Sequence, residues 1–351
     1  MTDSQIADRK VEHIRIITSD TGVERNNSGF DQIQLTHRAL PELNFGDINT
    51  QTTFLGKPLS FPLLISSMTG GTGDEILRIN RNLATAAEKT GVAMAVGSQR
   101  VMFTDQSATS SFALRDVAPT TPIVGNVGAV QLNYGFGHSE CLEAVEAIQA
   151  DGLYLHLNPL QEVIQPEGDV NFAGLLAQIA VITEVLPVPV LLKEIGCGLS
   201  AQDIQLAFDA GVRHFDVAGR GGTSWSRIEY HRRAHDGDDL GLVFQDWGLT
   251  TVDALQDARA YLSKANETTT LIASGGIRNG IDMAKSLILG ADLCGVAAPF
   301  LSAAQTSSEA VVAVIEKFRR EFQTAMFLLG CQNIAALRCN ADLLRQHGNS
   351  L

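Results

Sequence analysis

Two glycine-rich turns in the second half of the chain have the composition of a phosphate-binding site. Residues 274–278 read SGGIR and residues 295–298 read GVAA, and each turn ends a short apolar run. Glycine lets backbone N–H groups approach an anion, and the N-terminus of a following helix attracts negative charge. We therefore predict that both turns bind a phosphate, with Thr223, after a third glycine-rich turn, as a further donor. Glycines needed only for tight turns, and an ordinary loop threonine, are the alternatives.

Lys193 follows the apolar run VLL at residues 190–192. A charge at the end of a buried strand needs a partner, because isolated buried charge is costly. One explanation is a buried ion pair with a neighbouring glutamate. The other, which we favour, is that the ammonium group stabilises the anionic edge of a reduced flavin.

Polar residues also follow the run at residues 153–157. His156 and Asn158 are two positions apart, so on a strand they share a face, and Gln161 and Glu162 come next. Glu162 is suited to hold Mg²⁺ together with diphosphate oxygens, because Mg²⁺ prefers one or two carboxylates plus substrate phosphates. A single satisfied core histidine and a solvated glutamate at a helix start are the alternatives.

Basic residues near the N-terminus, namely Arg9, Lys10 and His13, could close over a diphosphate together with Arg100. Taken alone, they are better explained as a solvated tail. Cys197 lies between two glycines, but no histidine partner is evident in the sequence, so we interpret it as a packing residue.

Short apolar runs alternate with longer amphipathic segments from residue 63 onward. Eight runs are predicted as strands, at residues 63–66, 93–96, 123–125, 153–157, 190–193, 214–217, 270–273 and 293–296. Six segments are predicted as helices, at residues 74–90, 139–149, 172–186, 200–210, 250–262 and 281–289, with Ser139 and Ser200 as N-caps. Eight repeats of a strand and a helix indicate an α/β fold of the (β/α)8 TIM-barrel class, with the site at the carboxyl ends of the strands. A doubly wound open sheet is the alternative, and the absence of G-x-G-x-x-G before a first helix disfavours it.

The chain is predicted to form one domain over residues 1–351. Residues 1–45 would be an irregular N-terminal arm that covers the substrate, residues 219–247 an insertion after the sixth strand, and residues 303–351 a C-terminal helical tail.

Composition narrows the class of protein further. With a net charge of −13, the chain lacks the excess of basic residues that is typical of nucleic-acid-binding proteins. No apolar run is long enough to span a membrane. Five cysteines without a C-x-x-C pair indicate neither a disulfide framework nor a zinc site. We expect a cytoplasmic protein whose partner is a small molecule, with no nucleic-acid or membrane partner.

The chain resembles the type 2 isopentenyl-diphosphate isomerases, which are FMN-dependent barrels. The matching motifs cover residues 9 to about 300: RK at 9–10 with His13, MTGG at 68–71, GSQR at 97–100, HLNPLQE at 156–162, PEGD at 166–169, KEIG at 193–196, GRGGTSW at 219–225, SGGIR at 274–278 and AAP at 297–299. HLNPLQE combined with GRGGT is very specific, whereas the glycine-rich phosphate turn is shared by many flavin barrels. Ser66-Ser67 stands where the family often has Asn-Ala, which puts any side-chain role of Ser67 in doubt.

The resemblance implies a set of roles for the residues of these motifs. Binding of FMN would involve Ser67, Met68, Thr69, Ser98, Asn126, Lys193, Thr223, Gly275, Gly276, Arg278, Ala297 and Ala298. The diphosphate substrate would contact Arg9, Lys10, Ser98, Arg100, His156, Asn158 and Gln161, and Glu162 would bind Mg²⁺. The implied catalytic residues are Gln161, Lys193 and His156.

The implied reaction is the isomerisation of isopentenyl diphosphate to dimethylallyl diphosphate in isoprenoid biosynthesis. Reduced FMN would act in acid–base chemistry, and NADPH would serve only to reduce it. An FMN-dependent oxidoreductase that transfers hydride, such as a 2-hydroxy acid oxidase, is the main alternative, but residues 274–276 lack the histidine base that such an oxidase needs. A non-catalytic flavin sensor or scaffold is a further alternative, and a homo-oligomer, either tetramer or octamer, is expected by analogy with related barrels.

Overall fold

Eight parallel strands form a closed barrel in the computed structural model of the protein, which describes residues 12–13, 15–68, 70–233, 237–265 and 267–345. The strands are β3 (Leu63–Ile65), β4 (Ala93–Ala95), β5 (Ile123–Gly128), β6 (Gly152–Leu157), β7 (Val190–Glu194), β8 (His214–Asp216), β9 (Thr270–Ser274) and β10 (Leu293–Val296). Neighbours in sequence are neighbours in the barrel, and β10 closes the ring by pairing with β3. All eight predicted strands are confirmed, and the closed ring rules out the open sheet.

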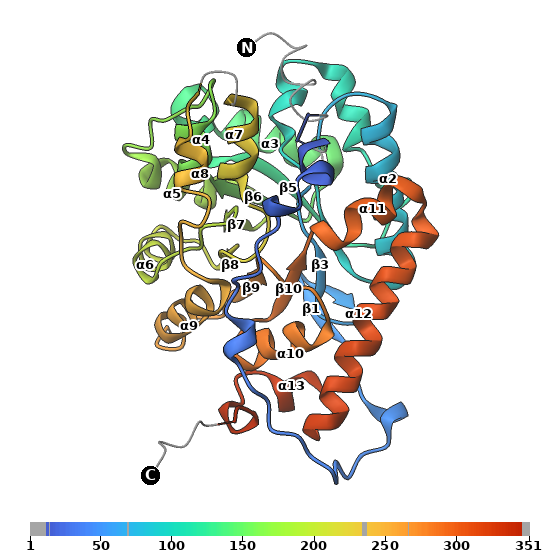
Figure 1. Ribbon diagram of the computed structural model, residues 1–351. Coiled ribbons are helices and arrows are strands. Elements are labelled where there is room, and N and C mark those ends of the chain that lie inside the picture. Colours follow the sequence, from blue (N-terminus) through green and yellow to red (C-terminus); the bar gives the residue numbers. More distant parts are fainter. Residues whose placement is uncertain (1–11, 14, 69, 234–236, 266, 346–351) are drawn as a thin grey trace.

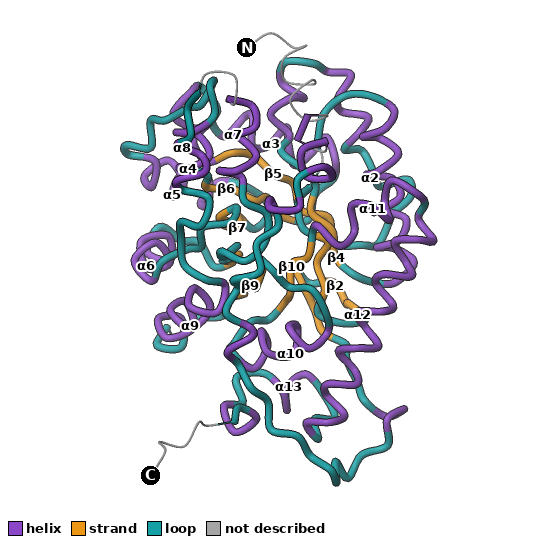
Figure 2. Tube along the Cα trace, in the orientation of Figure 1, coloured by secondary structure: helices purple, strands orange, loops and turns teal. Residues whose placement is uncertain are grey.

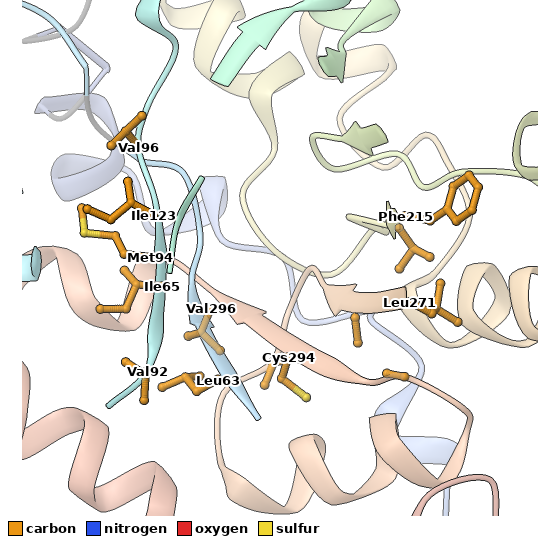
Figure 3. Close-up of a cluster of buried hydrophobic side chains, with 14 of the residues drawn as sticks. Leu63, Ile65, Val92, Met94, Val96, Ile123, Phe215, Leu271, Cys294 and Val296 are labelled. Atoms are coloured by element: carbon orange, nitrogen blue, oxygen red, sulfur yellow. The ribbon is translucent and has the colours of Figure 1, made fainter. Parts of the chain in front are cut away.

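The barrel strands have two buried faces, which explains why they read as continuous apolar runs. Side chains alternate along each strand between the surrounding helices and the barrel interior. Leu63 and Ile65 therefore belong to the large outer cluster, whereas Leu64 belongs to the inner one. Figure 3 shows part of the outer cluster, with Met94 and Val296 close to the side chains of β3.

A short hairpin closes the barrel interior at the amino ends of the strands. It consists of β1 (Thr52–Phe54) and β2 (Lys57–Leu59), paired in antiparallel fashion. Phe54 and Leu59 are buried in the inner cluster with Leu64 and Tyr154. The hairpin was not predicted from the sequence.

The six predicted helices are observed with small shifts of their ends, and all lie outside the strands (Figure 2). They are α2 (Asp74–Thr90), α3 (His138–Ile148), α5 (Leu175–Val185), α6 (Ala201–Asp209), α9 (Thr251–Leu262) and α10 (Gly280–Ile288). Ser200 caps α6 as predicted, and its Oγ accepts the N–H of Asp203 at 3.1 Å. The prediction for Ser139 was wrong because α3 begins one residue earlier. The Glu140 carboxylate reaches back to accept the N–H of Gly137 at 2.7 Å.

The connections that follow β6 and β8 contain additional helices at the carboxyl end of the barrel. These are α4 (Pro159–Ile164), α7 (Trp225–Arg233) and α8 (Leu240–Val243), and α4 packs against α7. The last two lie within residues 219–247, the segment predicted as an insertion. The predicted helical tail is also observed, as α11 (Ala298–Thr306), α12 (Ser308–Leu329) and α13 (Ile334–Leu337).

Residues 12–13 and 15–45, the part of the predicted irregular arm that the structure describes, contain short helical turns and contacts with the barrel. Residues 12–13 and 15–19 are helical, and the chain then runs along the outside of the barrel from α7 to the region of α13 (Figure 1, blue). Bridges at Glu24↔Thr223 and Leu35↔Leu344 attach it at both ends. Among the residues that the structure describes, no helix has the length and apolar character needed to cross a bilayer.

Candidate active site

A layer of polar side chains lies at the carboxyl ends of the barrel strands. Side chains two positions apart on a strand share a face. Lys193 and Ser274 therefore point to the same side as the interior residues Leu191 and Ile272, respectively. This layer lines a cavity in the position where barrels of this class carry their active sites. The predicted residues that line it are Ser67, Met68, Ser98, Asn126, His156, Gln161, Lys193, Thr223, Gly275, Gly276, Arg278, Ala297 and Ala298.

The Lys193 ammonium faces this cavity, and its charge is balanced by Asp216. Its Nζ lies 3.7 Å from Oδ2 of Asp216 and donates to the Glu194 carbonyl oxygen at 2.8 Å. Asp216 is fully buried and accepts hydrogen bonds from the Tyr154 hydroxyl at 2.9 Å and from Ser274 Oγ at 2.5 Å. Burial, and then the charge of Asp216, raise the pKa of Tyr154 well above its usual value. A buried carboxylate thus holds the lysine side chain at the cavity wall.

The neighbouring Glu194, the expected alternative partner, is engaged elsewhere. Its Oε2 accepts the N–H groups of Ile195 and Gly196 at 2.6 Å and of Cys197 at 2.5 Å. Burial, and then the charge of Glu194, raise the pKa of the Cys197 thiol to about 12. This high pKa supports the prediction that Cys197 is not a thiolate nucleophile.

Polar groups on β5 and β6 and directly after β3 form a further part of the cavity wall. His156 Nδ1 lies 2.8 Å from Oδ1 of Asn126, which fixes the orientation of the imidazole. The hydroxyl groups of Ser66 and Ser67 are buried and have no hydrogen-bond partner among the described residues. Buried hydroxyls are normally paired, so these two are suited to bind a polar ligand. Ser66 was not among the predicted site residues.

The predicted phosphate turn lies at one end of the cavity and packs too closely for any side chain at its glycines. A Cβ on Gly275 would lie 2.1 Å from the carbonyl oxygen of Gly219, and one on Gly276 would lie 2.4 Å from that of Gly221. Both glycines also have positive φ, at 103° and 78°. The turn thus presents bare backbone, as a phosphate cradle requires.

Glu24, from the N-terminal segment, reaches into the same end of the cavity. Its Oε1 accepts a hydrogen bond from Thr223 Oγ1 at 2.5 Å, and its Oε2 pairs with Nη2 of Arg278. The bridge between Glu24 and Thr223 also makes the segment part of the cavity wall. No local sequence pattern identifies Glu24, because its partners lie some 200 residues away in the chain.

Gln161 is fixed by a charged network that the sequence did not reveal. Its Nε2 donates to Oε1 of Glu229 at 2.8 Å, and Glu229 is fully buried between His13 at 3.2 Å and Arg232 at 2.7 Å. Burial alone would raise the pKa of the Glu229 carboxyl, but the hydrogen bond and charge of His13 and the charge of Arg232 outweigh it. They lower that pKa to about 2. Trp225, Glu229 and Arg232 are spaced four and three residues apart, a helical signal in the sequence that could have identified Glu229.

Asn158, Glu162 and Arg100 lie close together but are not part of the cavity lining. Glu162 is buried and accepts hydrogen bonds from Asn158 at 2.7 Å and from the N–H of Asp169 at 2.7 Å. Burial, the largest effect on the pKa of Glu162, raises it above the usual value. Arg100 forms an ion pair of 2.7 Å with Asp169. Arg9, Lys10 and Thr69 lie outside the described residues.

The residues present fit FMN. Two unpaired serine hydroxyls, a lysine cation and a bare glycine turn beside an arginine line one cavity, and they suit a polar ring, its anionic edge and a phosphate, respectively. The residues present are less suited to binding a metal ion. In the described part of the chain, no group of three or more acidic, histidine or cysteine residues could hold an ion, so Glu162 alone would need ligands from a substrate.

The sequence and fold match known proteins over nearly the whole chain. The family model described as FMN-dependent dehydrogenase matches residues 6–115 and 160–345. The isopentenyl-diphosphate delta-isomerase of Paracoccus zeaxanthinifaciens is 66% identical, over 99% of this chain and 100% of the relative. That of Hydrogenovibrio crunogenus is 57% identical, over 98% and 99%, and that of Nostoc is 44% identical, over 97% of both chains.

Solved structures share the fold at low sequence identity. The flavin-binding domain of baker's yeast flavocytochrome b2 aligns with a TM-score of 0.67 at 18% identity, over 95% of this chain and 82% of that one. A mandelate oxidase mutant with an FMN adduct aligns with a TM-score of 0.61 at 20% identity, over 92% and 91%. These likenesses support the barrel alone, whereas the full-length identities decide the family. The chain belongs to the FMN-dependent dehydrogenase family and, within it, to the type 2 isopentenyl-diphosphate delta-isomerases.

Proposed function

We propose that this protein isomerises isopentenyl diphosphate to dimethylallyl diphosphate. The observation that carries the proposal is Gln161, a neutral amide held at the cavity wall by Glu229. The turn at residues 274–276 also lacks the histidine base of a hydride-transferring oxidase. The similar isopentenyl-diphosphate delta-isomerases align with 99% and 98% of this chain, which supports the proposed isomerase activity. The reaction needs a proton added at one carbon and removed at another, in a site that excludes water.

Reduced FMN, when bound, supplies an acid–base group and an anionic ring edge. We assign the protein side of the chemistry to three residues. Lys193 balances the negative charge at the ring edge, Gln161 orients a proton beside the reacting carbons, and His156 binds the diphosphate. The buried pairing of Lys193 with Asp216 keeps the ammonium in place.

The cofactor contacts follow from the same cavity. We assign the ring to Ser67, Met68, Thr69, Ser98 and Asn126, and the phosphate to Thr223, Gly275, Gly276, Arg278, Ala297 and Ala298. The unpaired hydroxyl of Ser67 supports its side-chain role.

The substrate diphosphate is assigned to basic, amide and hydroxyl residues in and near the cavity. Ser98 and His156 line the cavity, whereas Arg100 and Asn158 are not part of its lining, and Arg9 and Lys10 are proposed from the sequence motif. Arg100 is paired with Asp169, so a diphosphate would compete with that carboxylate for the guanidinium group. Remote binding of this kind can orient the alkene over the ring.

The direct test is an anaerobic assay of the purified full chain with FMN, Mg²⁺, NADPH and isopentenyl diphosphate, with parallel samples that omit each component. We expect dimethylallyl diphosphate to form only with reduced FMN, without stoichiometric consumption of NADPH. Oxidation of NADPH in proportion to an added acceptor, with no isomerised product, would instead establish the oxidoreductase alternative.

Replacing Glu229 by glutamine should lower kcat by about 10²-fold, because the charge that holds Gln161 and His13 is lost. The free energy of unfolding at neutral pH should also fall, by about 3 kcal/mol, since the pKa of Glu229 drops from 4.5 to about 2 on folding. A carboxyl with a lowered pKa stabilises the fold above its unfolded pKa, and that stabilisation is lost as the pH falls from about 4.5 to 2. Turnover assays and urea unfolding at pH 7 and below pH 3 measure both effects.

The matched control for this variant is Glu316→Gln, which removes an exposed carboxylate on α12. It should leave both quantities unchanged. A Glu229→Gln enzyme with wild-type kcat would contradict the assigned role of the network.

Replacing Glu162 by glutamine should raise the Mg²⁺ concentration needed for half-maximal activity at least about tenfold, because the only carboxylate proposed to bind the ion becomes neutral. After treatment with EDTA, product formation is measured against added Mg²⁺, with Glu184→Gln on the exposed face of α5 as the control. Full activity with an unchanged Mg²⁺ dependence would rule out the metal role.

We also propose that the protein is cytoplasmic, that NADPH is its reductant and that it forms a tetramer or octamer. All five cysteines are free, which fits a reducing compartment. Several exposed apolar side chains on and near α4, α5 and α6, among them Val163, Val181 and Leu206, offer a surface for association. Light scattering with size-exclusion chromatography measures the oligomeric state directly.

A further inference from the structure

The carboxylate of Glu24 binds the two side chains to which the cofactor phosphate is assigned. Thr223 Oγ1 donates to its Oε1 at 2.5 Å, and Arg278 Nη2 pairs with its Oε2. Glu24 and Arg278 both line the cavity beside Gly275 and Gly276. A carboxylate of the chain thus lies at the phosphate end of the site.

The backbone around Glu24 is firmly attached, so only its side chain is free to leave this position. Arg25 donates its N–H to the Gly222 carbonyl oxygen at 3.1 Å, and Ser224 donates to that of Val23 at 2.8 Å. The Arg25 guanidinium adds hydrogen bonds to the carbonyl oxygens of Gly222 and Gly196. A rotation of the Glu24 side chain would release Thr223 and Arg278 without moving the segment.

We propose that Glu24 is an internal competitor of the FMN phosphate and thereby limits the affinity for FMN. A phosphate monoester and a carboxylate are both anions that accept the same hydrogen bonds, and the Thr223 hydroxyl has a single proton to donate. Like charges placed side by side also repel. Binding of the phosphate therefore requires Glu24 to leave its two partners, a cost that riboflavin, which has no phosphate, does not meet. This inference rests on the proposed position of the phosphate.

The test compares FMN and riboflavin binding to the flavin-free full chain, followed by flavin fluorescence. Glu24→Gln keeps the shape of the side chain but removes its charge, and it should lower the Kd for FMN about tenfold while leaving the Kd for riboflavin within about twofold of wild type. Asp31→Asn, an exposed carboxylate of the same segment, is the control and should change neither Kd. Circular dichroism verifies that each variant is folded, and Glu24→Ala provides a second variant with the same expected direction.

A double-mutant cycle identifies the partner through which Glu24 acts. In an Arg278→Gln background, Glu24→Gln should lower the Kd for FMN by less than the about tenfold of the single variant, because only the competition for Thr223 and the repulsion of the phosphate remain. An unchanged or weaker affinity of the single variant for FMN, or an equal gain for riboflavin, would overturn the proposal. A Glu24→Gln protein that binds FMN no better than riboflavin would overturn it as well, because the phosphate would then lie elsewhere. The product assay decides the isomerase function independently of these binding results.

Discussion

Replacing Lys193 by methionine is expected to lower kcat by about 10²–10³-fold, the cost typical of removing one group that stabilises developing charge. Lys193 places its ammonium at the cavity wall, and methionine preserves the length of the side chain but not the charge. The reduction potential of the bound FMN should fall at the same time, because the reduced ring loses a neighbouring cation. Turnover of isopentenyl diphosphate and a reductive titration of the flavin measure the two effects.

Loss of the lysine also leaves Asp216 buried without its counter-charge, which could unfold the protein for reasons unrelated to catalysis. The double variant Lys193→Met/Asp216→Asn removes this problem. It should recover stability but not activity. Lys317→Met, at an exposed position of α12, controls for the substitution itself. A Lys193→Met enzyme that retained activity within a few fold of wild type would refute the role of the charge.

Replacing Arg25 by methionine should reduce the free energy of unfolding by at least about 3 kcal/mol, because hydrogen bonds from a charged donor contribute about 1.5–3 kcal/mol each. The buried guanidinium donates to the carbonyl oxygens of Gly196 at 2.7 Å, Gly222 at 3.1 Å, Gln245 at 3.1 Å and Thr223 at 3.2 Å. These carbonyls belong to three separate loops at the rim of the barrel. Affinity for FMN should fall as well, because the loops that line the cavity lose their common anchor.

Urea unfolding and flavin titration measure these two consequences. The control is Arg320→Met, which removes an exposed arginine of α12. Arg25→Lys retains the charge but cannot reach all four carbonyls with one ammonium, so it should lie between the wild type and Arg25→Met. A stability of Arg25→Met equal to that of wild type would show that the loops are held by other contacts.

The barrel could be predicted from the sequence because its strands are buried on both faces. Continuous apolar runs such as Leu191-Leu192 mark such strands, and the polar residue that ends each run marks the carboxyl end, where the site lies. For this reason, the positions of His156 and Lys193 in the cavity wall could be predicted. The hairpin was overlooked, although Gly56 between two short alternating segments is a turn signal.

The charged partners of the site could not be predicted in the same way. Asp216 looks like an ordinary strand residue until the barrel closes and brings Tyr154 and Ser274 beside it. Glu24 meets its partners through contacts between distant segments, which no local period in the sequence reports. Glu229 has one local partner, Arg232, but its contacts with His13 and Gln161 also join distant segments. The sequence identifies the residues that face the cavity, whereas only the tertiary structure identifies those that hold them.

The closure of the barrel has a consequence for the order of events during synthesis on the ribosome. Glu24, which precedes the first barrel strand, forms one part of the cavity wall. Ala297 and Ala298, which follow the last strand, form another part. Since β3 pairs with β10, a nascent chain that ends before β10 has neither a closed ring nor a complete cofactor cavity. Flavin capture must therefore follow the emergence of nearly the whole chain, and fragments released early would have an open sheet edge exposed to aggregation.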